Sequence, residues 1–246
     1  MRALTGDLLL AAWEAGTRAR PEPRRPVALL SVALPGSDPG ALAALPVAER
    51  DLLLLRLRQL TFGPDLAVFA TCPDCTERLE FTLRADEMAG RLEAVTAAMA
   101  AGPVEWTEDG HRYRLRPATT DDLIASLAAP SSAAAQELLL ARCLQIESER
   151  AVSSPQALLA PAGAASRFEQ LHVDAELRCG IDCPGCSGHQ VLDIDIARFL
   201  WREVAAAATR LLGEIHLLAS AYGWREQDIV SLSPYRRAAY LELVGA

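Results

Sequence analysis

Two short cysteine pairs constrain what this chain can fold into more than any other feature. Both have the pattern Cys-Pro-x-Cys, with Cys72 and Cys75 in the first pair and Cys183 and Cys186 far downstream. A C-x2-C turn brings two thiolates onto one metal ion, and two such turns supply the four ligands of a closed tetrahedral zinc site. The sequence therefore predicts one structural Zn2+ bound by all four cysteines. Such a site supports the fold and has no open position for a substrate.

Alternatives to this ligand set remain open from the sequence. Cys179 and His189 flank the second pair and could replace one of the four cysteines. The two pairs could also be unrelated reduced thiols, because their separation is longer than in standard zinc ribbons. A Cys-Pro-x-Cys turn also resembles a redox dithiol, although no βαβ pattern surrounds either pair. A thiol-disulfide oxidoreductase is therefore kept as an alternative function.

The segments around the two pairs resemble two copies of one unit. Each pair follows an apolar stretch, and residues 78–83 alternate between polar and apolar side chains with the period of a β-strand. Residues 176–183 and 190–194 have the equivalent pattern around the second pair. We expect two hairpins with the cysteines at their tips, which together form a split zinc-ribbon-like module made of duplicated halves.

The rest of the chain favours helices. Ala and Leu supply much of the 51% hydrophobic content, while aromatic residues contribute only 5%, and the long stretches of Ala, Leu, Arg and Glu have high helix propensity. The expected fold class is mainly α with small β hairpins (α+β), with helical lobes around the split module. The expected regions are an N-terminal helical region (1–64), the first zinc knuckle hairpin (65–90), an inserted hairpin plus helical region (91–176), the second zinc knuckle hairpin (177–194) and a C-terminal helical region (195–246).

Local signals place elements in the N-terminal region. A short helix is expected at 5–15, with Thr5 as a cap and Gly16 as its stop. Residues 18–26 are rich in Arg and Pro and are expected to form an extended linker. The apolar segment 27–34 is buried, but periodicity does not distinguish a short buried strand from a helix there.

Prolines, glycines and acidic residues mark the ends of the longer helices. Pro46 opens a predicted helix at its first turn, and Gly63 ends it. Asp193 or Asp195 can cap the longest helix, which Gly223 ends. Two shorter helices follow and are expected to pack with the longest one.

The predicted insertion contains a further hairpin. Asp109 and Gly110 lie between two alternating segments, and Asp-Gly in that context is a strong hairpin signal. Its polar face carries Arg112, Arg114 and Arg116, which we expect to form an exposed strand face, with contact to an acidic partner as the alternative. Further helices are expected to begin at 119–122, at 133 and at Ser154-Pro155.

Charge and hydropathy disfavour two classes of partner. The formal net charge is −8 and the pI is near 5.1, which opposes general contact with phosphate backbones. A zinc-ribbon nucleic-acid-binding module is kept as an alternative function. The C-terminal helices could also form a helix-turn-helix in which Arg225, Arg236 and Arg237 contact phosphate, but the acidic neighbours of these arginines, Glu214, Glu226, Asp228 and Glu242, oppose that interpretation. No run reaches the roughly 18 uncharged apolar residues of a spanning helix, and the N-terminus is a poor signal peptide. We expect a cytoplasmic protein with reduced thiols and no membrane-spanning segment.

Nothing in the sequence indicates catalysis. His111, His172 and His216 are scattered, and general-base catalysis needs a convergent partner. No nucleophile elbow, Walker loop, dinucleotide glycine motif or H-E-x-x-H is present. Cys143 lies on an apolar helix face, where a small core residue is expected. We therefore predict that the protein is not an enzyme.

Several motifs together resemble one known family. Besides the two cysteine pairs they are LPVAERD at 45–51, TFGP at 61–64, YRLRP at 113–117, FLW at 199–201, EIHLLA at 214–219, YGW at 222–224, and Arg236, Arg237, Tyr240 and Leu241. Over most of its length the chain resembles the baseplate protein, or baseplate-hub assembly chaperone, of T-even-type phages and of phage-tail-like contractile injection systems. After each cysteine pair, where that family usually has glycine, this chain has Thr76 and Ser187.

The resemblance implies a function outside catalysis. It implies a structural component or assembly chaperone of the baseplate of a contractile tail. The expected partners are other baseplate, hub or tail proteins, and nucleic acid is not among them. The expected location is the cytoplasm, either free or within the assembled tail particle.

Overall fold

The computed structural model describes residues 1–148 and 161–245, so the predicted helix start at Ser154 lies outside the described part. The helices are α1 (Asp7–Arg18), α2 (Arg25–Ala33), α3 (Pro39–Ala43), α4 (Val47–Phe62), α5 (Ala85–Met99), α6 (Thr120–Ser126), α7 (Ser132–Cys143), α8 (Ala164–Val173), α9 (Ile196–Tyr222), α10 (Glu226–Ser231) and α11 (Pro234–Val244), with a 3-10 turn, η1 (Glu22–Arg24), before α2. The strands are β1 (Asp65–Thr71), β2 (Arg78–Arg84), β3 (Val104–Glu108), β4 (His111–Leu115), β5 (Leu144–Ser148), β6 (Arg178–Asp182) and β7 (His189–Asp193). The expected α+β class is confirmed.

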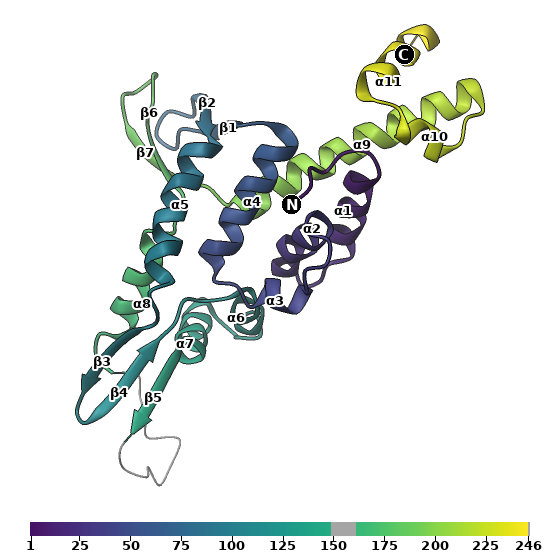
Figure 1. Ribbon diagram of the computed structural model, residues 1–246. Coiled ribbons are helices and arrows are strands. Elements are labelled where there is room, and N and C mark those ends of the chain that lie inside the picture. The colour runs from purple at the N-terminus through teal and green to yellow at the C-terminus, as the bar shows by residue number, and fades with distance from the viewer. Residues whose placement is uncertain (149–160, 246) are drawn as a thin grey trace.

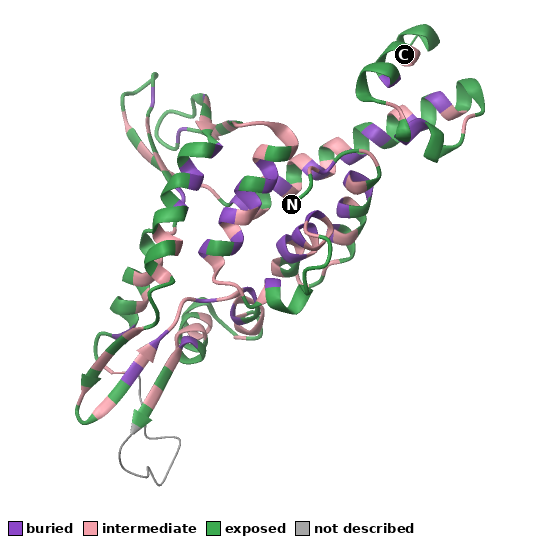
Figure 2. Ribbon diagram, viewed as in Figure 1, coloured by how far each residue is buried: buried purple, intermediate pink, exposed green. Residues whose placement is uncertain are grey.

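The helical body is built around α9. Its apolar residues recur at three- and four-residue steps, which places them on one face, and this face packs against α1, α2 and α4. Figure 1 shows the far end of α9 carrying α10 and α11 away from the body, and Figure 2 shows buried residues gathered where α1, α2 and α4 approach α9. The buried residues of α9 are Ile196, Leu200, Val204, Ala208, Leu211, Ile215 and Leu218.

By length and composition, α9 is also the one helix in the described residues that is long and apolar enough to cross a membrane. The sequence expectation of no spanning segment considered uncharged runs alone and did not identify this helix. Two acidic residues of α9 pair with buried arginines elsewhere in the fold. Glu203 accepts hydrogen bonds from Arg58 of α4 (2.8 and 3.0 Å), and Glu214 accepts one from Arg237 of α11 (2.8 Å). In this fold, α9 therefore connects the body to the C-terminal helices.

The ends of α1 differ from the prediction. The N-cap position is Gly6, and no side chain caps the helix, so the assignment of Thr5 as the cap is wrong. Gly16 lies inside α1, which continues to Arg18. A Cβ atom at Gly16 would lie 2.4 Å from Trp201 of α9, so this glycine permits close helix packing and does not stop the helix.

The predicted extended linker at 18–26 is also wrong in part. The turn η1 occupies its middle, and α2 begins at Arg25, with Pro26 in its first turn. Proline is compatible with the first turn because the N–H that it lacks has no partner within the helix there. Segment 27–34, which the sequence left ambiguous, lies mostly in α2, and Leu29 and Leu30 are fully buried.

Several other predicted helix ends are confirmed. Gly63 follows the last residue of α4 at a φ of 89°, as predicted, whereas Pro46 occupies the N-cap position, one residue before the first turn in which it was expected. Asp195, rather than Asp193, caps α9 by accepting the Arg198 N–H at 2.9 Å. Gly223 ends α9 in the left-handed conformation, which glycine adopts without strain.

Three antiparallel sheets accompany the described helices: β1–β2, β3–β4–β5 and β6–β7. The hairpin predicted around Asp109 and Gly110 is present as β3–β4, and Trp106 stacks on Tyr113 with ring centroids 5.1 Å apart. The third strand, β5, was not predicted, because the helical pattern of α7 continues to its first residue. Its pairing with β4 is a long-range contact that local sequence does not encode.

Candidate metal centre

The two cysteine pairs occupy equivalent turns at the tips of equivalent hairpins. The first turn joins β1 to β2 and the second joins β6 to β7, and Figure 1 shows these hairpins next to each other at one end of the molecule. Both turns are closed by the same two backbone hydrogen bonds. They are Cys72 N–H to Glu77 O (2.9 Å) and Thr76 N–H to Cys72 O (2.9 Å) in the first turn, and Cys183 N–H to Gly188 O (2.9 Å) and Ser187 N–H to Cys183 O (2.8 Å) in the second.

The four thiols of these turns meet in one small space. The Sγ atoms of Cys72 and Cys186 are 3.7 Å apart, and those of Cys75 and Cys183 are 3.5 Å apart. All four sulfurs lie within 4.8 Å of one another. Within the described residues, this is the one group of His, Cys, Asp or Glu side chains that lie close enough together to hold a metal ion. The short distances join the two hairpins, so a bound ion would link segments that are far apart in the sequence.

The cluster has a buried side and an exposed side. Cys72 and Cys183 are buried, while Cys75 and Cys186 are exposed. Leu79 of β2 is buried beside Cys72 and Cys183 in a small apolar cluster. The equivalent residue of each pair has the same environment, as expected for duplicated halves.

Backbone N–H groups and neighbouring sulfurs act on these thiols unequally. The pKa of Cys183 is lowered to about 7, first by the backbone N–H of Cys186. For Cys75, the backbone N–H of Glu77 lowers the pKa, but the neighbouring thiols, with Cys183 first among them, raise it to about 12. The groups titrate together, because a thiolate at one position disfavours a second negative charge beside it. A bound cation would favour all four thiolates, and its binding would therefore compete with protons.

The two alternative ligands lie outside this group. Cys179 is opposite Leu192 in the β6–β7 pairing, and its thiol points to the Gly180 carbonyl at 3.7 Å. The Nδ1 atom of His189 is 2.9 Å from Asp182 Oδ1, on the exposed surface of the same hairpin. The structure thus brings together Cys72, Cys75, Cys183 and Cys186, the first-choice ligand set, and leaves Cys179 and His189 apart from it.

One polar contact between the hairpins had no signal in the sequence. Gln190 of β7 donates from Nε2 to Asp74 Oδ2 at 3.1 Å and lies 4.0 Å from Cys72 Sγ. Gly188 permits this contact, because a Cβ atom there would lie 3.0 Å from the same Asp74 oxygen. The two turns are therefore joined by a hydrogen bond as well as by the sulfur cluster.

The residue after each cysteine pair has unusual backbone geometry. Thr76 has a φ of 62° and Ser187 has a φ of 58°, both in the left-handed region. Residues with a Cβ atom rarely adopt this conformation, whereas glycine does so readily. Each turn thus has a backbone geometry that glycine would adopt with less strain.

The histidines do not converge on a site in the described residues. His172 Nδ1 donates to Phe168 O at 2.7 Å, and its Nε2 accepts the Ala118 N–H at 3.0 Å, so the neutral ring is held by two backbone groups. Burial lowers the pKa of His172. His111 lies in β4 beside Tyr113, and His216 is exposed on α9. His172 therefore has a structural role that the sequence anticipated only in general terms.

No family model, no curated protein and no solved structure matches this chain. The metal centre is therefore characterised by its own geometry. The resemblance to the baseplate family stays a prediction from the sequence motifs.

Proposed function

We propose that this chain is a non-enzymatic structural component or assembly chaperone of the baseplate of a contractile phage tail or related injection system, with one structural zinc ion joining its two cysteine hairpins. The observation that carries the zinc assignment is the sulfur geometry. Four sulfurs placed tetrahedrally at the usual Zn–S distance of about 2.3 Å are about 3.8 Å from one another. The distances of 3.5 and 3.7 Å across the hairpins are close to that value.

The donor set favours zinc among common metals. Four thiolates are soft ligands that select zinc or iron–sulfur chemistry, and a tetrahedral set of four cysteines is common in structural zinc sites. Four protein ligands fill the coordination shell, which leaves no position for water or a substrate. The role assigned to the ion is therefore to hold the hairpins together.

The baseplate assignment rests on the sequence resemblance and is compatible with this architecture. An assembly protein needs surfaces with defined shape for its partners. The C-terminal helices project from the body on α9, and Tyr235 of α11 is 89% exposed. Exposed aromatic residues of this kind are enriched in protein–protein interfaces.

The alternative functions receive less support from the charges and the geometry. Four thiolates around Zn2+ carry a net charge of about −2, and exposed acidic residues surround the turns, which opposes phosphate binding. These residues are Asp74, Glu77, Glu80 and Asp182. Each cysteine pair faces the other pair rather than open solvent alone, which is unlike an isolated redox dithiol.

Metal analysis tests the zinc assignment. Protein purified without added metal should contain one zinc per chain by inductively coupled plasma mass spectrometry. Cys72→Ser and Cys183→Ser should each lose most of it, because three thiolates no longer complete the shell. Cys179→Ser is the matched control and should retain zinc. Protein without bound metal, or loss of zinc in the control alone, would overturn the assignment.

Particle composition tests the baseplate assignment independently. A tagged chain expressed from its own locus should co-purify with sheath, tube and spike proteins, either in finished tails or in assembly intermediates. Deletion of the gene should give tails without complete baseplates in electron micrographs. Normal baseplates after deletion would rule the assignment out, whatever the metal content.

A further inference from the structure

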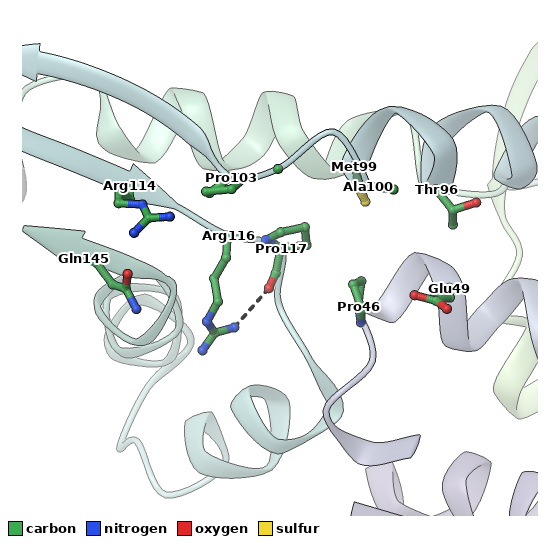
Figure 3. Close-up of a pocket in the computed structure, with 11 residues that line it drawn as sticks. Pro46, Glu49, Thr96, Met99, Ala100, Pro103, Arg114, Arg116, Pro117 and Gln145 are labelled. Carbon is green, nitrogen blue, oxygen red and sulfur yellow. Dashed lines mark hydrogen bonds between the residues drawn. The ribbon is translucent and has the colours of Figure 1, made fainter. Parts of the chain in front are cut away.

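A pocket lies where the helical body meets the three-stranded sheet, away from the metal centre. Its volume is about 380 Å3, within the range of sites that bind small ligands. Figure 3 shows α4 and α5 on one side of the pocket and the strands β4 and β5 on the other. The lining residues come from the start of α4, the end of α5, and strands β4 and β5 with the loop residues beside them.

Much of the pocket wall is apolar. Three of its residues, Pro46, Pro103 and Pro117, are prolines, which have no backbone N–H to offer a ligand. Met99 and Ala100 at the end of α5 add further apolar surface. Such a wall favours a ligand with an apolar body and restricts hydrogen bonding to a few side chains.

The polar donors gather on the sheet side of the pocket. Arg114 of β4 and Gln145 of β5 are cross-strand partners, so their side chains emerge side by side. Arg116 follows two residues after Arg114 on the same strand path, and Figure 3 shows all three side chains on this side. Glu49 lies on the opposite, helical side. A ligand carboxylate would therefore be received at the sheet side.

The arginines around this wall outnumber the carboxylates in direct contact with them. One carboxylate, Glu105, pairs with both Arg112 (2.8 Å) and Arg114 (2.9 Å). Another, the buried Asp122, pairs with both Arg116 (2.6 Å) and Arg142 (2.9 Å). Glu147 is 3.7 Å from Arg114, beyond hydrogen-bonding distance. Among the residues that line the pocket, the sheet side carries the guanidinium groups of Arg114 and Arg116 and no carboxylate, and the one lining carboxylate, Glu49, is on the helical side.

Arg114 lies within ion-pair distance of Glu105 and Glu147, but among these guanidinium groups it is the one with no aligned hydrogen bond in the described part of the chain. Its Nε lies close to Glu105, but the N–H is not aligned for a hydrogen bond, and the atom is buried without an aligned acceptor in the described part of the chain. Arg112, by contrast, donates a well-formed hydrogen bond to Glu105. Arg116 donates to Asp122 and to two backbone carbonyls. Among these arginines, Arg114 would therefore form the most favourable hydrogen bond with an acceptor on a ligand.

We propose that this pocket binds an acidic side chain, flanked by apolar residues, on a segment of a partner protein. The inference deepens the proposed function and rests on it, because an assembly protein requires such partners. The carboxylate lies at the sheet side, where it accepts from Arg114 and Gln145, and the apolar flanks lie on the proline wall. The sequence left open that Arg112, Arg114 and Arg116 contact an acidic partner. In this proposal Arg114 and Arg116 contact that partner in the pocket, whereas Arg112 pairs with Glu105 and does not line the pocket.

Calorimetric titration with a designed peptide tests this proposal. The probe is an N-acetylated, C-amidated hexapeptide of alternating leucine and glutamate, and its control has glutamine in place of glutamate. The intact protein should bind the acidic peptide at low salt and bind the control at least about tenfold more weakly, the loss expected for one charge-assisted hydrogen bond. Equal binding of both peptides would overturn the proposal, and this comparison needs no variant.

Two neighbouring substitutions locate the binding. Arg114→Gln should weaken binding of the acidic peptide by about tenfold, whereas Arg112→Gln, on the same strand and with the same Glu105 partner, should leave it unchanged. Unchanged binding in Arg114→Gln would overturn the proposal. Hexanoate that displaces the peptide at equal concentration would identify a free organic acid as the ligand instead. Failure here leaves the zinc and tail-particle tests unaffected, so the two proposals fail separately.

Discussion

The two cysteine hairpins have equivalent turns at their tips, but their strands differ in length and in how far they are buried in the core. The strands of the first hairpin have seven residues each, Leu66 of β1 is fully buried in the main core, and β2 leads directly into α5. The strands of the second have five residues each, and neither contains a buried residue. The core residues beside it are Leu177 before β6 and, after β7, the partly buried Ile194 and the buried Ile196. The first hairpin is thus part of the helical body, and the second is attached to it mainly at its tip and base.

This difference indicates what a metal ion would do. An isolated two-stranded hairpin is marginally stable in water, and the second hairpin has little apolar burial to support it. The sulfur cluster and the bond from Gln190 to Asp74 are its contacts with the first hairpin at the tip. The ion would therefore act chiefly on the second hairpin, using the first as a fixed support.

The largest predicted effect is a selective loss of structure on metal removal. A zinc chelator should lower the hydrogen-exchange protection of β6 and β7 by about a thousandfold or more, because structural zinc contributes roughly 10–16 kcal/mol in zinc-finger peptides. The amides of β1 should keep most of their protection, since Leu66 anchors that strand. Exchange measured by mass spectrometry before and after chelation checks this. Equal losses in both hairpins would contradict the proposed asymmetry.

Core truncation should affect the hairpins in the opposite order. Leu66→Ala should lower the free energy of unfolding by about 2–5 kcal/mol, the usual cost of a cavity at a buried leucine. Val191→Ala on the second hairpin is the matched control, because Val191 is 59% exposed and should change stability by less than about 0.5 kcal/mol. Denaturant unfolding of the metal-bound protein measures both. A similar cost at both positions would show that the second hairpin is also part of the core.

The stability of the segment that precedes the second hairpin should depend on pH, because His172 lies in this segment. This residue ties α8, which precedes β6, to the backbone of Ala118. Burial lowers its pKa below the ordinary value of 6.5, so the unfolded chain takes up a proton at a higher pH than the folded chain does. The stabilising contribution of His172 is complete above about pH 6.5 and decreases as the pH falls toward the lowered pKa, by at most about 1.4 kcal/mol per pH unit.

Difference measurements isolate this effect from protonation of the cysteines. The stability gap between the native chain and His172→Gln should shrink as the pH falls from 7.5 to 5.5 (about the range in which an ordinary histidine titrates). His216→Gln, on the exposed surface of α9, is the matched control for the loss of an imidazole. A gap that does not change with pH would show that His172 contributes no titration to stability.

The hairpins also show what the sequence could and could not predict. The cysteine spacing and the alternation of residues 78–83 were sufficient for both hairpins and for the four-thiol group, because these signals are local and were repeated. The sequence did not predict that the first hairpin is packed into the core and the second is not. Leu66 lies in the apolar segment before the first pair and Val191 lies in the alternating segment after the second pair. The position of each hairpin relative to α4, α5 and α9 decides which of these side chains is buried.

The same distinction explains the errors elsewhere. Helix ends set by local capping, such as Asp195 and Gly223, were predicted. Gly16 was wrongly predicted to end the helix. A glycine is needed at this position because Trp201, a residue remote in sequence, packs closely against it. Strand β5 and the bond from Gln190 to Asp74 were missed because both depend on partners that only the tertiary fold brings near.

The smallest predicted effect compares the two turns at their left-handed residues. Thr76→Gly and Ser187→Gly remove a strain of roughly 1–2 kcal/mol for a residue with a Cβ atom in this conformation, offset by about 0.5–1 kcal/mol of extra glycine chain entropy. Thr76→Gly should therefore raise the stability of the whole protein by about 0.5–1 kcal/mol, because its hairpin belongs to the core. Ser187→Gly should leave global unfolding unchanged and strengthen only zinc binding and β6–β7 protection. Thr76→Ala and Ser187→Ala retain the strain and serve as controls, and a gain in either of them equal to that of glycine would show that backbone geometry is not the cause.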